Sequence, residues 1–273
     1  MRSPHSTPST WDRLEALESS ERACPLALLF RQVLQPIGLD AFGELLQIFQ
    51  GLMRDGSRLL AHLKGELRSN GTDGLPAQVT ASAGMDALVH AIEAFIARVA
   101  TPLARGLALE AARHIGRSLE VVCCESGNTA ARDDMAIGSH LAGMAFANSS
   151  CCAVHALALP LGGRFHIPHG VITGCFAGEM MRHNSPACAE DFAALTAALG
   201  WGAVDGAAFA GRLDAVADAT GLRAQLRRFV VPGDAIATMA RDAVAIRRLI
   251  DPNPREVTEA DATRIYRAVL EAA

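Results

Sequence analysis

The sequence predicts an all-α fold, and three observations support this prediction. The chain has 273 residues, of which 50% are hydrophobic but only 5% aromatic. Ala and Leu supply most of the apolar residues, and both favour helices over strands. Apolar residues also recur three and four positions apart along nearly the whole chain, whereas no alternating strand pattern exceeds a few residues. We therefore expect a helical-bundle domain with a substantial core.

The first 70 residues divide into two predicted segments. Residues 1–24 are rich in Ser, Pro and charged side chains, which is typical of a mobile tail. Residues 25–70 contain short amphipathic stretches that prolines and glycines interrupt, which predicts a short helical segment. The turn-rich stretch "RSNGTDGLP", residues 68–76, follows, and we place the domain boundary there.

Residues 71–273 are predicted to form one almost purely helical domain. Thr258 begins a "TEAD" stretch that is typical of a capping box, in which a side-chain oxygen accepts a hydrogen bond from the first helical turn. The predicted helices cover residues 79–99, 102–123, 129–147, 153–159, 169–182, 189–199, 206–219, 222–229, 233–250 and 258–272.

Charge and composition exclude several classes of protein. The net charge of -4 and a pI near 6.1 leave no basic stripe for phosphates, so we expect no nucleic-acid partner. The N-terminus lacks an apolar signal core, and no run approaches the roughly 20 apolar residues that span a bilayer, so we expect a cytoplasmic protein. The seven cysteines show no C-x-x-C spacing, which predicts reduced, mostly buried thiols and no thiolate metal site.

The stretch "MDALVHAIE" places Asp86 and His90 four positions apart on one predicted helix. Side chains at this spacing share a face, with Cβ atoms about 5 to 6 Å apart, so both can reach one ion. A hydrogen bond on a helix surface would need the same spacing. Glu93, one turn further on, is either a solvated carboxylate or a group that orients a metal ligand.

A second stretch, "VHALALPLGGRFHIPHG", contributes His155 and His169. His155 lies among apolar residues, where an unpaired polar group costs about 1 to 3 kcal/mol, so a shared cation would satisfy both rings. Asp86, His90, His155 and His169 together offer one carboxylate and three imidazoles, a set that suits Fe²⁺ or Zn²⁺. The alternative is that these residues are purely structural.

Four stretches of the sequence resemble one protein family. They are "GLPAQVTASAGMDALVHAIEAF", "ARDDMAIGSHLAGMAFANSS", "VHALALPLGGRFHIPHG" and "NPREVTEADATRIYRAVLEAA". In order and spacing they resemble the C-terminal helical metal-binding domain of the iron-containing (group III) alcohol dehydrogenases, which has a dehydroquinate synthase-like fold. The resemblance implies that Asp86, His90, His155 and His169 bind the metal, and that Phe146 lies near the nicotinamide-side pocket.

The sequence departs from the family pattern in two places. Leu159 stands where family members usually have a His or Tyr that relays protons or contacts the cofactor. The glycine-rich "GGGS" loop of the family's N-terminal nucleotide-binding domain is also absent. The glycine cluster at residues 200–206 follows a predicted helix instead of a strand, so we interpret it as a turn. We therefore expect the nucleotide-binding domain to be missing.

The resemblance implies a metal-dependent oxidoreductase that interconverts alcohols with aldehydes or ketones using NAD(P), truncated and impaired in this chain. Its expected partners are a small alcohol or aldehyde and either a second copy or a chain carrying the nucleotide domain. The alternative is a non-catalytic metal-binding or interaction protein derived from that domain. His166 is interpreted as a solvated loop residue rather than a ligand-orienting one. No role is expected for the remaining histidines, which are His5, His62, His114, His140 and His183.

Overall fold

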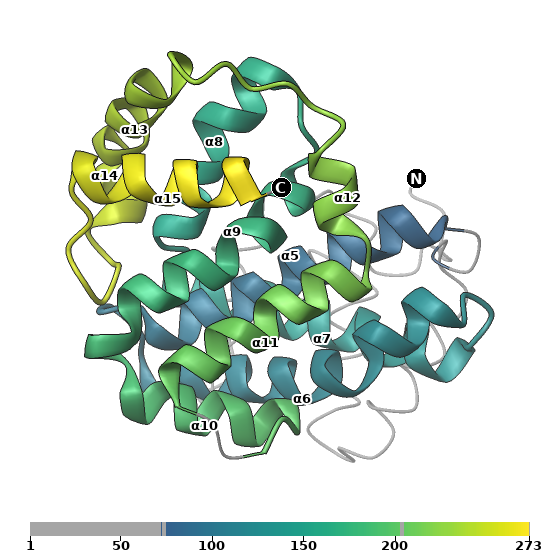
Figure 1. Cartoon of the computed structure of the whole chain (residues 1–273). Coiled ribbons are helices and arrows are strands. Elements are labelled where there is room, and N and C mark those ends of the chain that lie inside the picture. The colour runs from purple at the N-terminus through teal and green to yellow at the C-terminus, as the bar shows by residue number, and fades with distance from the viewer. Residues whose placement is uncertain (1–71, 73–74, 203–204, 273) are drawn as a thin grey trace, which may run out of the picture. The chain divides into compact units, whose positions relative to one another are not determined.

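The computed structural model describes residue 72 and residues 75–202 and 205–272 (Figure 1). Contacts between residues group Arg68–Ala273 into one compact unit, to which these residues belong. The predicted mobile tail at 1–24 and the predicted short helical segment at 25–70 lie outside the described residues. They remain predictions.

Every regular element in the described part of the chain is a helix, which confirms the predicted all-α class. The elements are α5 (Ala77–Ile96), α6 (Pro102–Cys124), α7 (Thr129–Ala147), α8 (Ala153–Phe165), α9 (His169–Asn184), η1 (Ser185–Ala187), α10 (Ala189–Leu199), α11 (Gly206–Ala219), α12 (Leu222–Leu226), α13 (Ala235–Ala245), α14 (Arg247–Ile250) and α15 (Glu259–Ala272).

Helices α5 and α9 form the centre of the bundle. Helix α5 packs against α6, α7 and α9, while α9 also contacts α8, α11 and α15 (Figure 1). Among the described helices, α5 alone has the length and apolar composition of a membrane span, but 67% of that stretch is buried inside the bundle. We interpret α5 as a core helix, because burial inside the protein accounts for its apolar composition.

Helix α8 is longer than the sequence predicts. We expected it to end at Leu159, before Pro160 and the glycine pair, but it continues to Phe165. A proline inside a helix removes one backbone hydrogen bond and strains the preceding turn. Here Leu157 and Leu161 are fully buried on either side of it, so the apolar packing of this helix offsets that loss. The helix ends where His166 adopts a left-handed conformation.

Other helix ends also differ from the predictions, among them those of α5, which spans Ala77–Ile96 where residues 79–99 were expected, and one cap agrees. The predicted helix at 233–250 is divided at Ile246, which separates α13 from α14. The predicted helix at 222–229 ends at Leu226. The predicted capping box is confirmed, because the Asp261 amide donates to Thr258 Oγ1 at 3.1 Å and the Thr258 amide donates to Asp261 Oδ2 at 3.1 Å.

An ion cluster on the surface joins α6 to α7. Asp134 accepts hydrogen bonds from Arg117, at 2.6 Å to its Nε, and lies 3.0 Å from His114 Nδ1. The hydrogen bond from Arg117, followed by that from His114, lowers the pKa of Asp134 to about 2. The carboxylate therefore stays ionised under any mildly acidic condition and helps to hold the two helices together.

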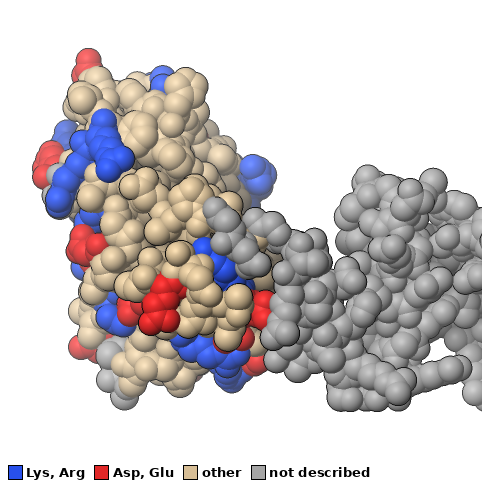
Figure 2. Space-filling view, turned by 90° about the vertical axis from the view of Figure 1, so that its right-hand side faces the viewer, with Lys and Arg blue, Asp and Glu red and all other residues tan. Residues whose placement is uncertain are grey.

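Charged groups are scattered over the face shown in Figure 2. Arg side chains form small groups there, separated from one another by Asp, Glu and uncharged residues. This face carries no continuous basic strip of the kind that nucleic-acid backbones bind.

Candidate metal centre

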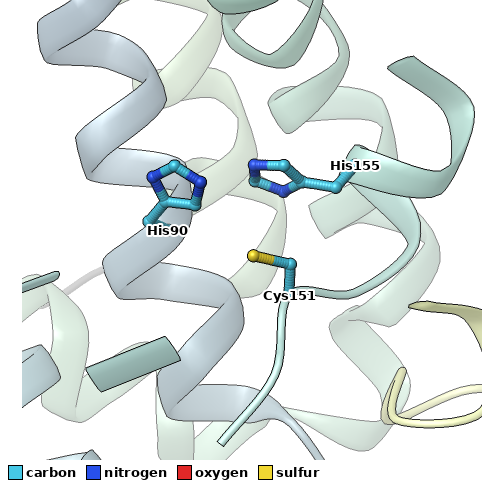
Figure 3. A group of neighbouring side chains, drawn as sticks. All are labelled: His90, Cys151 and His155. Atoms are coloured by element: carbon cyan, nitrogen blue, oxygen red, sulfur yellow. The ribbon is translucent and has the colours of Figure 1, made fainter. Parts of the chain in front are cut away.

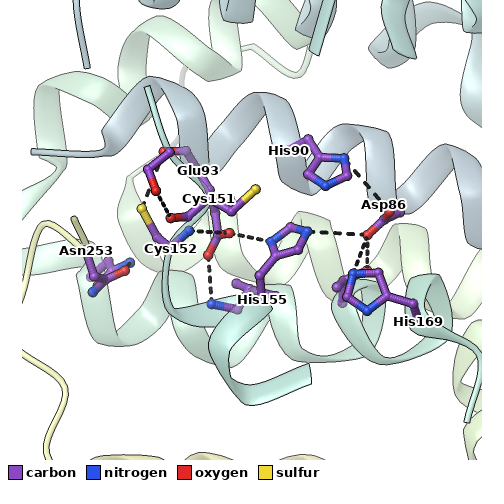
Figure 4. Close-up of polar contacts among 12 residues, drawn as sticks. Asp86, His90, Glu93, Cys151, Cys152, His155, His169 and Asn253 are labelled. Atoms are coloured by element: carbon purple, nitrogen blue, oxygen red, sulfur yellow. Dashed lines mark hydrogen bonds and ion pairs between the residues drawn. The ribbon is translucent and has the colours of Figure 1, made fainter. Parts of the chain in front are cut away.

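The four residues predicted as metal ligands come from three helices and meet at one place (Figure 4). Asp86 and His90 lie one turn apart on α5, His155 is in the first turn of α8, and His169 is the first residue of α9. Pro168 precedes α9 and fixes the backbone at the point where the His169 ring leaves the helix.

Three members of this group, Asp86, His155 and His169, offer atoms at the spacing of ligands around one ion, and His90 lies beside them. Asp86 Oδ1 is 3.6 Å from His155 Nε2 and 3.6 Å from His169 Nε2. Asp86 Oδ2 is 3.9 Å from His90 Nδ1. These distances exceed a hydrogen bond. Two atoms that each lie about 2.1 Å from a tetrahedral ion are about 3.4 Å apart, so the observed spacing fits a shared cation.

The buried imidazole of His155 provides the test of whether a cation fits. Its side chain is only 7% exposed, and Nε2 has no hydrogen-bond partner within the described part of the chain. An unsatisfied buried polar atom costs about 1 to 3 kcal/mol, and a cation would remove that cost. The donor set of one carboxylate and three imidazoles suits Fe²⁺ or Zn²⁺, so the residues fit the predicted metal.

Glu93 fixes the orientation of His155. This carboxylate is completely buried and accepts hydrogen bonds from His155 Nδ1 at 2.6 Å, from the Cys152 amide at 2.8 Å and from the Val154 amide at 2.7 Å (Figure 4). Because Nδ1 donates to Glu93, Nε2 is the ring nitrogen that faces Asp86, and it could bind a cation once it has lost its proton. Of the two interpretations of Glu93, the structure supports the orienting one and excludes the solvated one.

Burial and charge set the proton affinities of the group. Burial alone would lower the pKa of His155, but the carboxylates of Glu93 and Asp86 raise it to about 9. Burial lowers the pKa of His90 and of His169. Burial would raise the pKa of Asp86, yet contacts with His155, His90 and Thr173 bring it below its usual value. The group thus combines the ionised Asp86 carboxylate and a protonated His155 with the neutral imidazoles of His90 and His169, so binding of a cation would displace the proton from His155.

Two further residues named from the sequence lie beside this centre. Phe146, on α7, has its ring centroid 4.7 Å from that of His90. Leu159 lies one turn after His155 on α8 and is 41% exposed, so it adds an apolar group to the surface there. The placement of Phe146 beside a nicotinamide stays a prediction.

The other described histidines lie away from the centre. His140 and His166 are exposed, which for His166 agrees with the solvated-loop interpretation. His183, expected at a helix surface or end, is near the end of α9 but buried, with Nε2 2.8 Å from the Glu256 carbonyl oxygen. The sequence also missed Cys151, whose thiol lies beside His90 and His155 (Figure 3).

A comparison with protein families identifies the chain's relatives. The profile described as "Fe-containing alcohol dehydrogenase family, C-terminal" matches residues 80–270. The chain belongs to the iron-containing alcohol dehydrogenase family. The resemblance recognised in the sequence is therefore confirmed.

Several members of the iron-containing alcohol dehydrogenase family are similar to this chain. Long-chain-alcohol dehydrogenase 1 of Geobacillus thermodenitrificans is 38% identical over 210 residues, covering 73% of this chain and 52% of the relative. The crystal structure of a 1,3-propanediol oxidoreductase matches with a TM-score of 0.63 and 34% identity, covering 72% of this chain and 53% of the other. A sulfoacetaldehyde reductase from Bifidobacterium kashiwanohense, solved in complex with NAD+, matches with a TM-score of 0.67 and 28% identity over 74% of this chain and 53% of the other. The chain thus spans about half the length of these relatives.

Proposed function

We propose that this chain is the metal-binding part of an oxidoreductase that interconverts alcohols with aldehydes or ketones using NAD(P). The observation that carries the proposal is the buried His155 Nε2, which has no hydrogen-bond partner and faces the Asp86 carboxylate at 3.6 Å. Family membership supports the same kind of chemistry.

Asp86, His90, His155 and His169 hold the cation, with Fe²⁺ expected first and Zn²⁺ as an alternative. When bound, such a cation acts as a Lewis acid toward an alcohol or carbonyl oxygen. Glu93 keeps His155 in the tautomer whose Nε2 can serve as a ligand. The His169 side chain is 44% exposed, so a small substrate can reach the cation from the side of this ring.

Phe146 contacts one of the proposed ligands, and Leu159 follows another by one helical turn. The Phe146 ring packs beside His90 and shields that imidazole from water. Leu159 has no group that accepts a proton, so the alcohol proton has to pass to solvent. This apolar character suits a substrate with a hydrocarbon chain next to its hydroxyl group.

The nicotinamide cofactor supplies the hydride acceptor or donor. Neither residues 75–202 nor residues 205–272 include a strand, so they lack the strand, glycine-rich loop and helix that cradle a dinucleotide. We infer that the cofactor is held by residues outside these ranges, by a second copy or by a separate chain.

Metal content and turnover test the proposal together. We expect the purified chain to bind Fe²⁺ and the variants Asp86→Ala and His169→Ala to lose it, with lower melting temperatures in the presence of Fe²⁺, because an ion bound only by the native state stabilises that state. His140→Ala, which removes an exposed histidine away from the centre, serves as the matched control and should keep its iron. Unchanged iron content in both ligand variants would refute the ligand assignment.

Activity separates the enzyme from the alternative function. Oxidation of ethanol, 1-propanol or 1,3-propanediol is followed through formation of NADH or NADPH, with and without Fe²⁺. Iron-dependent turnover supports the oxidoreductase. Tight iron binding with no turnover of any alcohol or aldehyde would favour a non-catalytic metal-binding protein.

A further inference from the structure

The thiol of Cys151 lies inside the candidate metal centre. Cys151, His90 and His155 each offer a ligand atom within 4.8 Å of one another, and Figure 3 shows the sulfur near both rings. A second group, which consists of Asp86, His155 and His169, meets the same criterion. The two groups share His155 and differ in the kind of donor that completes them, namely a thiol or a carboxylate.

The position of Cys151 is fixed by its neighbours along the chain. The Cys152 amide donates to Glu93 Oε2 at 2.8 Å, and the Ser149 hydroxyl donates to the Ala94 carbonyl at 3.0 Å. The Ser150 hydroxyl donates to the Cys151 carbonyl oxygen at 2.7 Å. The segment before α8 is thus anchored to α5 on both sides of Cys151, so the thiol is held beside His90.

The Cys151 thiol has no other evident role in the described part of the chain. No disulfide forms there, and its sulfur makes no hydrogen bond. Burial, followed by the nearby carboxylates Glu93 and Asp86, raises the pKa of the thiol, which makes it a poor nucleophile. A divalent cation can still bind such a sulfur, because coordination releases the thiol proton to solvent without any change in oxidation state.

His155 allows only one cation at a time. Its Nδ1 is occupied by Glu93, so Nε2 alone is available to a metal. This atom is buried and unpartnered, which is the independent sign that a ligand belongs here. His155 belongs to both groups, so an ion held by this imidazole can be completed by Asp86 and His169 or by Cys151 and His90. Thiolates favour Zn²⁺ and softer ions, whereas carboxylates favour harder ones.

We propose that Cys151 is a metal ligand, and that His90, Cys151 and His155 form a thiolate site for Zn²⁺, Cd²⁺ or Co²⁺ that overlaps the carboxylate site. The proposal rests on the proposed function only in sharing His90 and His155 with it. The kind of ion therefore determines which of the two sets of ligands binds it. The sulfur donor should raise the affinity of this centre for zinc above that of the carboxylate and imidazoles alone.

Titration with Co²⁺ under anaerobic conditions tests the proposal directly, because thiolate-bound Co²⁺ has a charge-transfer band in the near ultraviolet. We expect this band in the unmodified chain and in Asp86→Ala, and its loss in Cys151→Ser and Cys151→Ala. Cys123→Ser, which removes a half-buried thiol on α6, is the matched control and should keep the band. Zn²⁺ affinity should fall in Cys151→Ala by at least the roughly 10- to 100-fold that loss of a ligand-orienting partner costs, while Fe²⁺ affinity stays close to that of the parent.

The possible results separate the two proposals. Co²⁺ binding without the thiolate band, or a band that persists in Cys151→Ala, overturns the role of Cys151 and leaves the carboxylate site intact. Absence of Co²⁺ binding overturns the role of Cys151, while the iron content of the unmodified chain still decides the carboxylate site. If the Cys151 variants fail to fold, alkylation of Cys151 in the unmodified chain decides the matter by mass spectrometry. Zn²⁺ should slow that alkylation, and an unchanged rate would refute the proposal.

Discussion

Replacing Gly170 by alanine should force α9 away from α5 and open the candidate metal centre. Gly170 follows His169 on α9, and Ser82 lies one turn before Asp86 on α5. A Cβ at position 170 would lie 2.1 Å from the Ser82 carbonyl oxygen, whereas real Cβ contacts essentially never fall below 3.0 Å. The two backbones must therefore separate by about 0.9 Å, the difference between these distances. Neither backbone can yield in the way a flexible side chain can.

This separation is large compared with the tolerance of a metal site. Metal-ligand distances hold to about 0.2 Å, so a shift of about 0.9 Å between His169 and Asp86 would remove one of them from coordination. We expect Gly170→Ala to weaken Fe²⁺ binding at least tenfold, or about 1.4 kcal/mol. Overpacking should also lower the free energy of unfolding of the metal-free protein by about 1 to 3 kcal/mol.

Isothermal titration with Fe²⁺ and urea unfolding in the presence of a chelator measure the two effects separately. Gly106→Ala is the matched control, because nothing lies within 4 Å of a Cβ at that position on α6. It should bind Fe²⁺ as the parent does and gain about 0.4 to 1 kcal/mol of stability. A folded Gly170→Ala protein with the parent's Fe²⁺ affinity would show that the contact between α5 and α9 does not set the spacing of the ligands.

Two more predictions concern buried and surface carboxylates. Glu93→Gln leaves at least one buried donor unpaired, so it should lower the free energy of unfolding by about 1 to 3 kcal/mol and Fe²⁺ affinity by roughly 10- to 100-fold. The control Glu120→Gln, at an exposed side chain, should change neither quantity. If the two variants behave alike in urea unfolding and Fe²⁺ titration, this prediction is refuted. Asp134 has a pKa of about 2 in the folded protein against 3.8 ordinarily, so its contribution is present above pH 4 and is lost as the pH falls toward 2. Asp134→Asn should lower the free energy of unfolding by about 1 kcal/mol at pH 7, after allowance for solvent screening. In urea unfolding, the difference between variant and parent should shrink below pH 4. A difference that does not depend on pH would contradict the assignment.

The sequence predicted best the helices whose ends carry their own signals. Helix α7 begins after Asn128 and α11 after Asp205, and both caps accept a hydrogen bond from the first turn. Helix α10 ends at Gly200, which adopts a left-handed conformation. These three helices have the predicted limits because local side chains determine where each begins or ends. The predicted end of α8 was wrong because burial of the residues around Pro160, which is a tertiary effect, lets the helix continue past the proline.

The candidate site was predictable only in part, for a similar reason. The spacing of Asp86 and His90 is visible within one helix, and His155 and His169 attracted attention through their apolar and proline-rich surroundings. The sequence offered two interpretations of Glu93 and could not choose between them, because its partner His155 is 62 residues away. Cys151 was missed because thiol sites were sought through C-x-x-C spacing, and its companions are histidines from other segments. The ligand set itself stays a prediction until a metal is measured.

The exposure of the imidazoles gives the candidate centre a closed end and an open end. The His155 side chain is 7% exposed, that of His90 is 21% exposed and that of His169 is 44% exposed. An arriving hydrated ion would meet His169 first and exchange its last water molecules for His155 at the bottom. Departure would follow the reverse order. The residence time of the ion should therefore depend on how readily the outermost ring swings aside, while the innermost ring stays in place.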